Sequence, residues 1–143
     1  MTIPVIDLSD FTGEDPKLKS SFITRLGKAF EEVGFVAVKN HGISDELIEK
    51  LYRYVQEFFS LPAEKKKLYE IPGLAGQRGY TSFGKEHAKG SEAPDLKEFF
   101  QYGQTVPNDH PLKSEYPDNV KVNDIEGFNE TLLKAYRAFE KSG

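Results

Sequence analysis

Three stretches of the chain carry apolar residues at helical spacing, and the first of them follows Asp15 and Pro16. From there to Gly34 the apolar positions recur every three or four residues, which places them on one face of a helix: Leu18, Phe22, Leu26, Ala29, Phe30 and Val33. Asp15 suits the N-cap, and Pro16 suits the first helical position because that position needs no N–H. The pattern predicts an amphipathic helix that ends at Gly34.

Two further helices are predicted along the chain. Ser44 suits an N-cap, and Asp45 and Glu46 fall in the positively polarised first turn. The apolar stripe that follows consists of Leu47, Ile48, Leu51, Val55, Phe58 and Phe59. The last helix starts near Asp124 and carries Phe128, Leu132, Ala135, Tyr136 and Phe139. We expect both helices to bury these stripes.

Short apolar runs outside these helices predict strands. Residues 3–8 contain a Pro near their start, which favours a strand at the edge of a sheet. Residues 35–38 have the pattern of a short buried strand, and the aromatic residues of 97–102 favour a third strand. Residues 71–90 contain five glycines and are predicted to form a loop. Binding groups concentrate on loops, so this stretch is the first place to look for a site.

A short helix is also predicted over residues 61–68, with Pro62 near its start. It contains the triplet of Lys65, Lys66 and Lys67. Runs of like charge on a helix usually form a solvated face, so we expect all three lysines to be exposed.

The composition is that of one globular α+β unit. The chain has 143 residues, of which 38% are hydrophobic and 29% are charged, and this length can bury one core. Its net charge is -4 without a cluster of Lys and Arg, so nucleic acid is not an expected partner. The opening residues lack signal-peptide features, and no window approaches the roughly 20 apolar residues of a membrane span. We expect a cytoplasmic protein without a membrane partner.

The absence of cysteine limits the chemistry, because any metal must then be held by His and carboxylate side chains. Iron sites with two histidines and one carboxylate commonly use a His with a carboxylate two residues on. None of His41, His87 and His110 has that neighbour. We expect His41 to bond backbone groups at a strand-to-helix turn and His110 to be exposed. His87, in the glycine-rich loop, is the best placed of the three to meet a ligand.

Common hydrolase and kinase signatures are absent from the sequence, including the Gly-x-Ser-x-Gly elbow and the phosphate-binding Walker loop. Arg78 and Tyr80 in the glycine-rich loop are the most suggestive side chains. A guanidinium can hold a carboxylate through two hydrogen bonds, and Tyr80 offers a hydroxyl on an aromatic ring. The alternative is structural, with Arg78 paired to a nearby Glu and Tyr80 packed on a strand.

Several short motifs occur in an order that resembles a known family. They are IPVIDL at 3–8, GFVAVKNHGI at 34–43, FFSLPAEKK at 58–66 and RGY at 78–80. Together they resemble the N-terminal region of the isopenicillin N synthase-like non-haem Fe(II) and 2-oxoglutarate-dependent dioxygenases, over residues 3–104. The resemblance implies that His41 is structural, because the corresponding histidine is not an iron ligand in this family.

The resemblance implies a fold in which N-terminal helices and strands flank a double-stranded β-helix, or jelly-roll, core that is mostly absent from this chain. Residues 1–104 correspond to the dioxygenase N-terminal region, and residues 105–143 to a loop and helix leading towards the catalytic β-helix. The family binds iron through a His-x-Asp pair and a distal His, and holds 2-oxoglutarate with an Arg-x-Ser pair. All of these lie downstream of the matching region, so we expect no catalytic or metal-binding residue in this chain.

The implied activity is the oxidation of a small-molecule substrate by O2, with Fe(II) and 2-oxoglutarate as cofactors, through hydroxylation, desaturation or ring closure. The N-terminal region would help to form the wall of the substrate pocket. The residues expected to bind substrate are Arg78, Tyr80, Phe99 and Gln101. In the penicillin-forming synthase the substrate-binding Arg corresponds to Gln77 of this chain, so Arg78 is one position out of register.

Alternation along the third predicted strand divides its side chains into two pairs. Phe99 and Gln101 face one side, and Phe100 and Tyr102 face the other, so one pair can line the pocket while the other packs into the core.

Two other functions stay open at this point. The penicillin-forming and ethylene-forming relatives use Fe(II) and O2 without 2-oxoglutarate. The second alternative is that the chain is a complete, non-catalytic module that binds a ligand or partner. Such a module should cover its sheet edges and apolar faces, whereas a fragment should expose the face that met the barrel.

Overall fold

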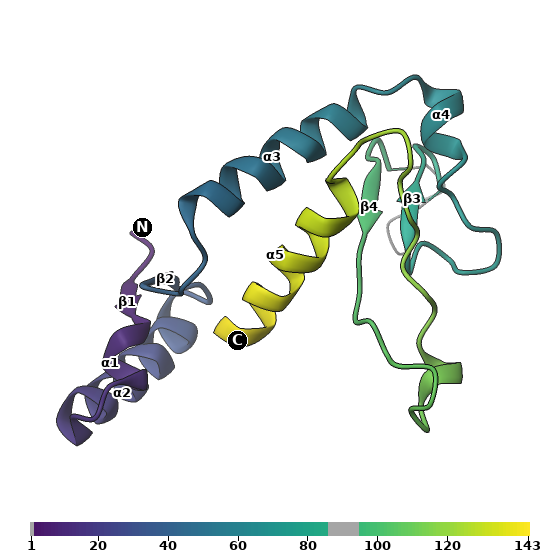
Figure 1. Cartoon of the computed structure of the whole chain (residues 1–143). Helices are drawn as coiled ribbons and strands as arrows, with labels where there is room; N and C mark the ends of the chain where they lie inside the picture. Colours follow the sequence, from purple (N-terminus) through teal and green to yellow (C-terminus); the bar gives the residue numbers. More distant parts are fainter. Residues whose placement is uncertain (1, 86–94) are drawn as a thin grey trace. The chain divides into compact units, whose positions relative to one another are not determined.

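The computed structural model describes residues 2–85 and 95–143, and its helices and small sheets confirm the α+β class (Figure 1). The residues group into two compact units. Unit 1 comprises Met1–Ile43 with Ser142–Gly143, and unit 2 comprises Ser44–Lys141. No helix of the described part combines the length and apolar character needed to span a membrane. The predicted division after residue 104 follows sequence resemblance rather than packing, and it stays a prediction.

Unit 1 is built from one long helix and a pair of short strands. Its elements are β1 (Val5–Asp7), α1 (Leu8–Thr12), α2 (Pro16–Glu32) and β2 (Ala37–Lys39). β1 and β2 pair in parallel, with Ile6 opposite Val38. Parallel strands need a crossover connection, and α2 lies in it. The strand predicted over residues 3–8 is therefore confirmed in part and continues directly into α1.

The first predicted helix is confirmed at both ends. The Asp15 carboxylate accepts a hydrogen bond from the Lys17 N–H at 2.8 Å, as an N-cap should. At the other end Gly34 has a φ of 80°, and its N–H donates to the Ala29 carbonyl at 3.0 Å. Glycine adopts this left-handed conformation without a Cβ clash, which explains why the helix ends there.

Asp7 ties the end of β1 to the turn that follows β2. Its carboxylate accepts hydrogen bonds from the Ser9 N–H at 3.0 Å and from the Asn40 amide at 2.8 and 2.9 Å. Lys39 adds an ion pair at 3.2 Å. The hydrogen bonds from Ser9 and Asn40 hold the pKa of Asp7 well below its usual range.

His41 lies in the same turn and has the structural role that the sequence predicts. Its Nδ1 accepts a hydrogen bond from the Ile43 N–H at 3.1 Å. Gly42 beside it has a φ of 74°, which a residue with a side chain rarely adopts. The Asn-His-Gly triplet therefore builds the turn from β2 towards the next helix.

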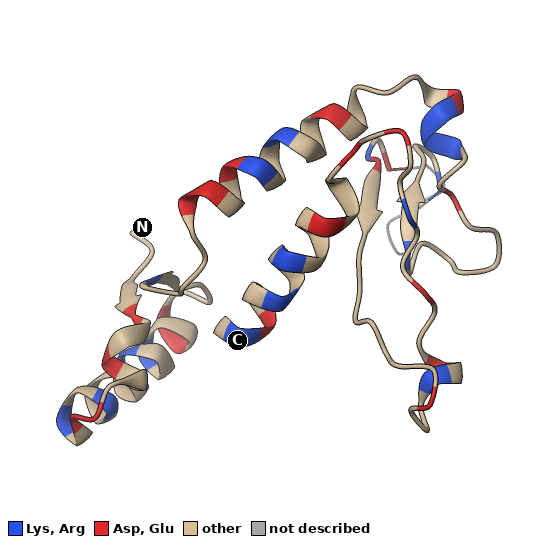
Figure 2. Cartoon of the chain, viewed as in Figure 1, with Lys and Arg blue, Asp and Glu red and all other residues tan. Residues whose placement is uncertain are grey.

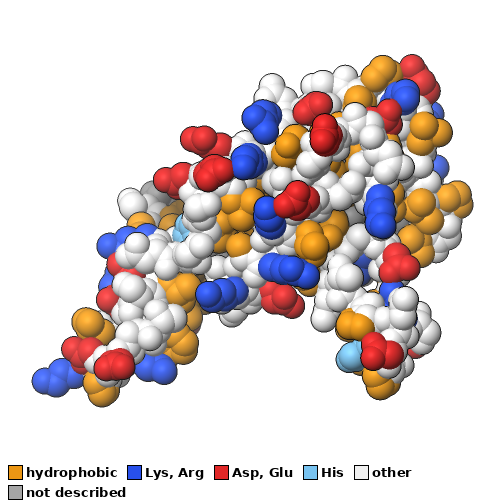
Figure 3. Space-filling view, viewed as in Figure 1, with side chains coloured by type: hydrophobic (Ala, Val, Ile, Leu, Met, Phe, Trp, Pro, Cys, Tyr) orange, Lys and Arg blue, Asp and Glu red, His pale blue; other side chains and the backbone are white. Residues whose placement is uncertain are grey.

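The prediction of a buried strand at residues 35–38 was wrong. β2 is exposed along its length, and Phe35 before it is 69% exposed. The run lies in a two-stranded sheet, which has fewer neighbours to cover it than the larger sheet that a buried apolar strand requires. Other exposed apolar side chains of unit 1 are Ile3, Val5, Ile23 and Phe30. Hydrophobic side chains are visible on the surface around α1 and α2, at the lower left of Figure 3.

Unit 2 combines three helices with an antiparallel strand pair. Its elements are α3 (Asp45–Phe59), α4 (Ala63–Lys67), β3 (Gly79–Thr81), β4 (Phe99–Gln101), the 3₁₀ turn η1 (Lys113–Glu115) and α5 (Phe128–Ser142). The Ser44 hydroxyl accepts a hydrogen bond from the Leu47 N–H at 3.2 Å, which confirms the predicted N-cap of α3. Figure 2 shows acidic and basic residues interspersed along α3 and α5, as expected for amphipathic surface helices.

The core of unit 2 is a cluster of aromatic rings around Phe58, which is fully buried. Among the described residues, five rings lie with their centroids 4.9 to 5.9 Å from that of Phe58, and they belong to Phe59, Tyr69, Tyr80, Phe100 and Phe128. These rings come from α3, the segment after α4, β3, β4 and α5. Tilted and edge-on ring pairs at such distances favour a fixed arrangement of the elements that carry them.

The expectation of three exposed lysines was wrong for Lys66, which is only 7% exposed. Lys65 and Lys67 are exposed as predicted. The Lys66 ammonium is held by the Glu98 carboxylate, a residue 32 positions away. A local charge run carries no information about so distant a partner.

Candidate ligand-binding site

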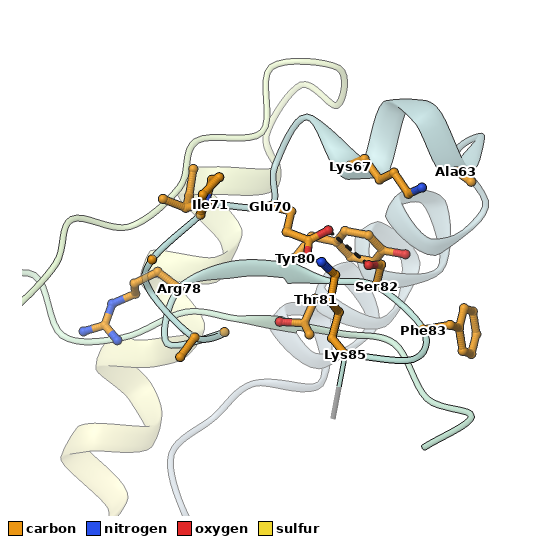
Figure 4. A pocket seen from close by; sticks show the side chains of 14 residues that line it. Ala63, Lys67, Glu70, Ile71, Arg78, Tyr80, Thr81, Ser82, Phe83 and Lys85 are labelled. Atoms are coloured by element: carbon orange, nitrogen blue, oxygen red, sulfur yellow. Dashed lines mark hydrogen bonds and ion pairs between the residues drawn. The ribbon is translucent and has the colours of Figure 1, made fainter. Parts of the chain in front are cut away.

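A pocket of about 870 Å³ lies beside β3 in unit 2 (Figure 4). α4 contributes Ala63 and Lys67, and the glycine-rich turn after it contributes Ile71 and Gly76. The remaining wall is formed by β3 and by the residues just before and after it. Sites for small molecules have volumes of about 300 to 1,000 Å³, so this pocket is large enough for one.

Gly79 makes β3 possible inside the stretch that was predicted to be a loop. Its φ is 76°, and a Cβ placed there would overlap the Tyr69 carbonyl oxygen and the Val120 side chain. The next residue, Tyr80, donates its N–H to the same Tyr69 carbonyl at 2.9 Å. The close approach of β3 to the segment after α4 therefore requires glycine at this position.

Tyr80 is anchored by a buried ion pair behind the pocket. Lys66 Nζ lies 2.9 and 2.8 Å from the two carboxylate oxygens of Glu98, and it also donates to the Phe59 carbonyl at 3.2 Å. The Tyr80 hydroxyl donates to Glu98 at 2.5 Å. Tyr80 is 3% exposed, so its ring is held against the core while its edge lines the pocket.

The ionisation of this group of three side chains is set by burial and by hydrogen bonding. Burial raises the pKa of Tyr80, and the hydrogen bond to Glu98 raises it further. Burial also acts to raise the pKa of Glu98, but the hydrogen bonds from Lys66 and Tyr80 outweigh it and leave that pKa below its ordinary value. Tyr80 is therefore a neutral donor and Glu98 an anion at neutral pH.

Arg78 lies half-buried immediately before β3. Its Nη1 donates to the Gln77 carbonyl at 2.7 Å, and a Cβ placed on Gly103 would overlap its guanidinium. Its Nε is buried and has no hydrogen-bond partner among the described residues. The ion pairs of that part of the chain also contain no carboxylate bound to Arg78, so the expected structural pairing with a Glu is not found there.

Thr81 and Ser82 complete the strand side of the pocket. Both are buried, and the Ser82 hydroxyl donates to Glu70 at 3.1 Å. The Thr81 hydroxyl oxygen is buried with no partner among the residues that the structure describes. The Lys85 ammonium lies 3.5 Å from Glu70. Within residues 2–85 and 95–143, the pocket therefore has one satisfied carboxylate and two buried polar atoms without a partner, on Arg78 and Thr81.

The structure brings together two of the four predicted site residues. Arg78 and Tyr80 both line the pocket. Phe99 lies beside it, since a Cβ placed on Gly76 would be 3.5 Å from the Phe99 ring, whereas Gln101 is exposed and is not a lining residue. Their strand neighbour Phe100 packs on Phe58, in agreement with the expected alternation.

Other residues of the site were not predicted, among them Lys66, Thr81 and Glu98. Thr81 was missed because the five glycines of 71–90 favoured a loop, so β3, the strand that places Thr81 at the pocket, was not predicted.

The remaining histidine predictions have different outcomes. His110 is exposed as expected, and its Nδ1 accepts a hydrogen bond from the Leu112 N–H at 3.2 Å. His87 lies outside the described residues. Within residues 2–85 and 95–143, no three His, Asp or Glu side chains lie close enough together to hold a metal ion. We therefore assign no iron ligand and derive no iron-dependent step from this part of the chain.

Comparison with known proteins gives the family. A family model described as "non-haem dioxygenase in morphine synthesis N-terminal" matches residues 3–123. A 2-oxoglutarate-Fe(II) type oxidoreductase of Aspergillus fumigatus is 31% identical, over 94% of this chain and 42% of the relative. A 1-aminocyclopropane-1-carboxylate oxidase of Dictyostelium discoideum is also 31% identical, over 91% of this chain and 36% of the relative.

A solved structure gives the same result for the fold. A 2OG-Fe(II) oxygenase family protein from Caulobacter crescentus aligns with a TM-score of 0.80 and 30% identity. The alignment covers 99% of this chain and 46% of that protein. The chain thus spans less than half the length of the proteins that it matches. Both the family model and the shared fold confirm the resemblance carried by the sequence motifs, and the chain belongs to the N-terminal family of the non-haem dioxygenases.

Proposed function

We propose that this chain is the N-terminal portion of a non-haem Fe(II)- and 2-oxoglutarate-dependent oxygenase. The whole enzyme would oxidise a small molecule with O2, by hydroxylation, desaturation or ring closure. The observation that supports this most directly is the likeness, over 99% of the chain, to a 2OG-Fe(II) oxygenase family protein. The 2-oxoglutarate-Fe(II) type relative supports the same cofactors.

In this proposal the double-stranded β-helix core lies in polypeptide beyond residue 143, and residues 105–143 lead towards it. That core would hold the iron and 2-oxoglutarate, which supply the oxidising chemistry when bound. The contribution of this chain is to bind and orient the substrate and to keep water from it.

The pocket beside β3 would be part of the substrate wall. We assign this role to Arg78 and Tyr80, with Phe99 beside the pocket on the neighbouring strand. Because the Tyr80 hydroxyl is committed to Glu98, Tyr80 offers a fixed ring rather than a free hydroxyl. Arg78 has a buried Nε without a partner among the described residues, and a polar group of the substrate would satisfy it.

A second candidate is an oxidase that uses Fe(II) and O2 without 2-oxoglutarate. The 1-aminocyclopropane-1-carboxylate oxidase of Dictyostelium discoideum favours it, because its match to this chain is as strong in identity as that of the 2-oxoglutarate-Fe(II) type relative.

The test is turnover by the polypeptide in which these 143 residues are followed by their native continuation. It is incubated with Fe(II), ascorbate, O2 and 2-oxoglutarate, and succinate is measured by mass spectrometry. We expect succinate to form and to require both Fe(II) and 2-oxoglutarate. The 143-residue chain alone is the control and should form none.

Two other results are informative. Consumption of O2 that requires Fe(II) and is indifferent to 2-oxoglutarate would replace the leading proposal with the oxidase. If neither succinate formation nor O2 consumption is detected, both enzyme proposals are contradicted and the non-catalytic module is favoured.

A further inference from the structure

The buried ion pair of Lys66 and Glu98 joins the elements that surround the pocket beside β3. Lys66 lies on α4, and its ammonium group bonds both carboxylate oxygens of Glu98 at 2.9 and 2.8 Å and the Phe59 carbonyl at 3.2 Å. Glu98, immediately before β4, accepts a hydrogen bond from the Tyr80 hydroxyl of β3 at 2.5 Å. Lys66, Glu98 and Tyr80 thus form a network, the Lys66 network, that connects the end of α3 with α4, β3 and β4.

The helix α4 and the strand β3 both contribute side chains to the pocket. Ala63 and Lys67 come from α4, and Tyr80 and Thr81 come from β3 (Figure 4). Lys66 is not a lining residue, because successive residues of a helix point in directions about 100° apart. Its side chain is buried, while that of Lys67 reaches the pocket. The Lys66 network therefore ties α4 to β3 from behind the pocket.

The strands that the Lys66 network joins are short. β3 and β4 have three residues each, and a two-stranded sheet is marginally stable by itself. The Tyr80 N–H donates to the Tyr69 carbonyl at 2.9 Å, and Glu70 forms an isolated bridge with Gly79. Hydrophobic burial is non-directional, whereas a hydrogen bond restricts the distance and the angle between its two groups. The side-chain network therefore adds directional contacts between α4 and the two strands.

Stability alone does not explain why charged groups occupy this position. A buried ion pair can often be replaced by well-packed apolar side chains with little loss of stability, because the desolvation of the charges offsets their attraction. We propose that Lys66 and Glu98 are positioning residues of the substrate wall, which act through Tyr80 to hold α4 and the β3–β4 pair in one arrangement. Neither Lys66 nor Glu98 lines the pocket, so neither touches a ligand there. As a statement about substrate binding this rests on the oxygenase function proposed above, whereas as a statement about the wall it needs neither iron nor turnover.

The first test is hydrogen exchange, followed by mass spectrometry, in the polypeptide in which these residues are followed by their native continuation. The apolar variant combines Lys66→Met, Tyr80→Phe and Glu98→Leu. Exchange of the β3 and β4 amides reports local opening, and exchange of the α5 amides reports opening of the unit 2 core, in which Phe128 and Ala135 are buried.

The expected result is selective acceleration of the two strands. A hydrogen bond to a charged group contributes about tenfold or more to an equilibrium, so the β3 and β4 amides should exchange about tenfold faster in the apolar variant. The α5 amides should change by less than about threefold, because apolar replacement retains the overall stability. Equal acceleration in α5 and in the strands would mean that the network contributes only to overall stability. That result, or no acceleration in either place, would overturn the proposal.

A single substitution keeps the test decisive if the apolar variant does not fold. Tyr80→Phe removes one hydroxyl group and leaves the ion pair in place, and it should also accelerate exchange in β3 without accelerating it in α5. The matched control is Tyr136→Phe on α5, whose ring contacts that of Tyr102. The control should leave exchange in β3 at the wild-type rate. Wild-type exchange of β3 in Tyr80→Phe would overturn the assignment.

A second readout separates positioning from folding. A library of small metabolites is screened for compounds that increase succinate formation by the longer polypeptide, and KM is measured for the compound with the largest effect. In the apolar variant this KM should rise about tenfold or more, because small displacements of a binding wall strongly weaken productive binding. The KM for 2-oxoglutarate should stay at the wild-type value, because the proposed core binds it. An unchanged KM for the compound, or an equal rise in both KM values, would overturn the substrate role.

The outcome is separable from that of the turnover assay. Selective acceleration of the β3 and β4 amides, together with no succinate from the longer polypeptide, would retain the positioning network and reject the oxygenase. Succinate formation with equal acceleration of α5 and the strands would do the reverse.

Discussion

Replacing Lys66 by Met removes the cation from the buried ion pair behind the pocket. The side chains of Lys66 and Glu98 are only 9% and 16% exposed, and their charged groups are joined at 2.8 Å. In the variant the Glu98 carboxylate keeps its hydrogen bond from Tyr80 but has no opposite charge. The apolar Met side chain fills most of the space that the Lys stem occupied.

The size of the effect follows from this geometry. Removing one partner of a buried ion pair costs about 3 to 5 kcal/mol, because the other charge is left uncompensated. Glu98 retains some contact with solvent and one hydrogen bond, so we expect Lys66→Met to lower the free energy of unfolding by about 3 kcal/mol. Removing both charges, in Lys66→Met with Glu98→Gln, should cost less than the sum of the two single changes by about 2 kcal/mol.

The assay is urea unfolding at pH 7, followed by circular dichroism at 222 nm. The matched control is Lys134→Met, which breaks the surface ion pair with Glu130, whose side chains are 63% and 70% exposed. That change should cost no more than about 0.5 kcal/mol. A loss below about 1 kcal/mol for Lys66→Met, together with additive single and double variants, would refute the buried-pair argument.

Three further predictions concern pH, glycine and the unpaired hydroxyl. The pKa of Asp7 is lowered, so its ionised form stabilises the fold above its ordinary pKa of about 3.8 and this contribution is lost as the pH falls below that value. The melting temperature should therefore fall less steeply from pH 5 to 2 in Asp7→Asn than in the wild type, and parallel curves would contradict this. Gly27→Ala should stabilise by about 0.5 to 1 kcal/mol, because a Cβ there meets nothing in the middle of α2. By contrast, Gly79→Ala should lower the free energy of unfolding by more than about 2 kcal/mol, because its Cβ would overlap neighbouring atoms and its backbone would be strained. Urea unfolding measures both variants, and a Gly79→Ala variant more stable than Gly27→Ala would contradict the prediction. Thr81→Val removes a buried unpaired hydroxyl and should raise the stability of the ligand-free chain by about 1 kcal/mol, whereas a loss of that size would mean that the hydroxyl has a partner.

The helices of this chain were predictable because their signals are local. Asp15 and Ser44 cap α2 and α3 as expected, and the apolar spacing of 3.6 residues locates both helices. The start of α5 was predicted about four residues too early. Asp124 and the residues before α5 are instead held by distant side chains, since Tyr69 and Lys65 both bond the Asp124 carboxylate.

The candidate site was predictable only in part, because its decisive contacts are long-range. Arg78 and Tyr80 were identified from residue type and from glycine-rich surroundings. The partner that fixes Tyr80 is Glu98, and the cation that neutralises Glu98 is Lys66. No periodicity joins positions so far apart in the chain. β3 was missed for a related reason, since its pairing with β4 and its contact with Tyr69 overcome a sequence rich in glycine.

The central claim is that this chain is the N-terminal portion of a longer oxygenase. The most direct measurement is the intact mass of the polypeptide purified from its native source. Since the chain spans 42% of a curated relative and has a mass of 16.2 kDa, we predict a mass more than twice that value. An intact mass of 16.2 kDa would contradict the claim.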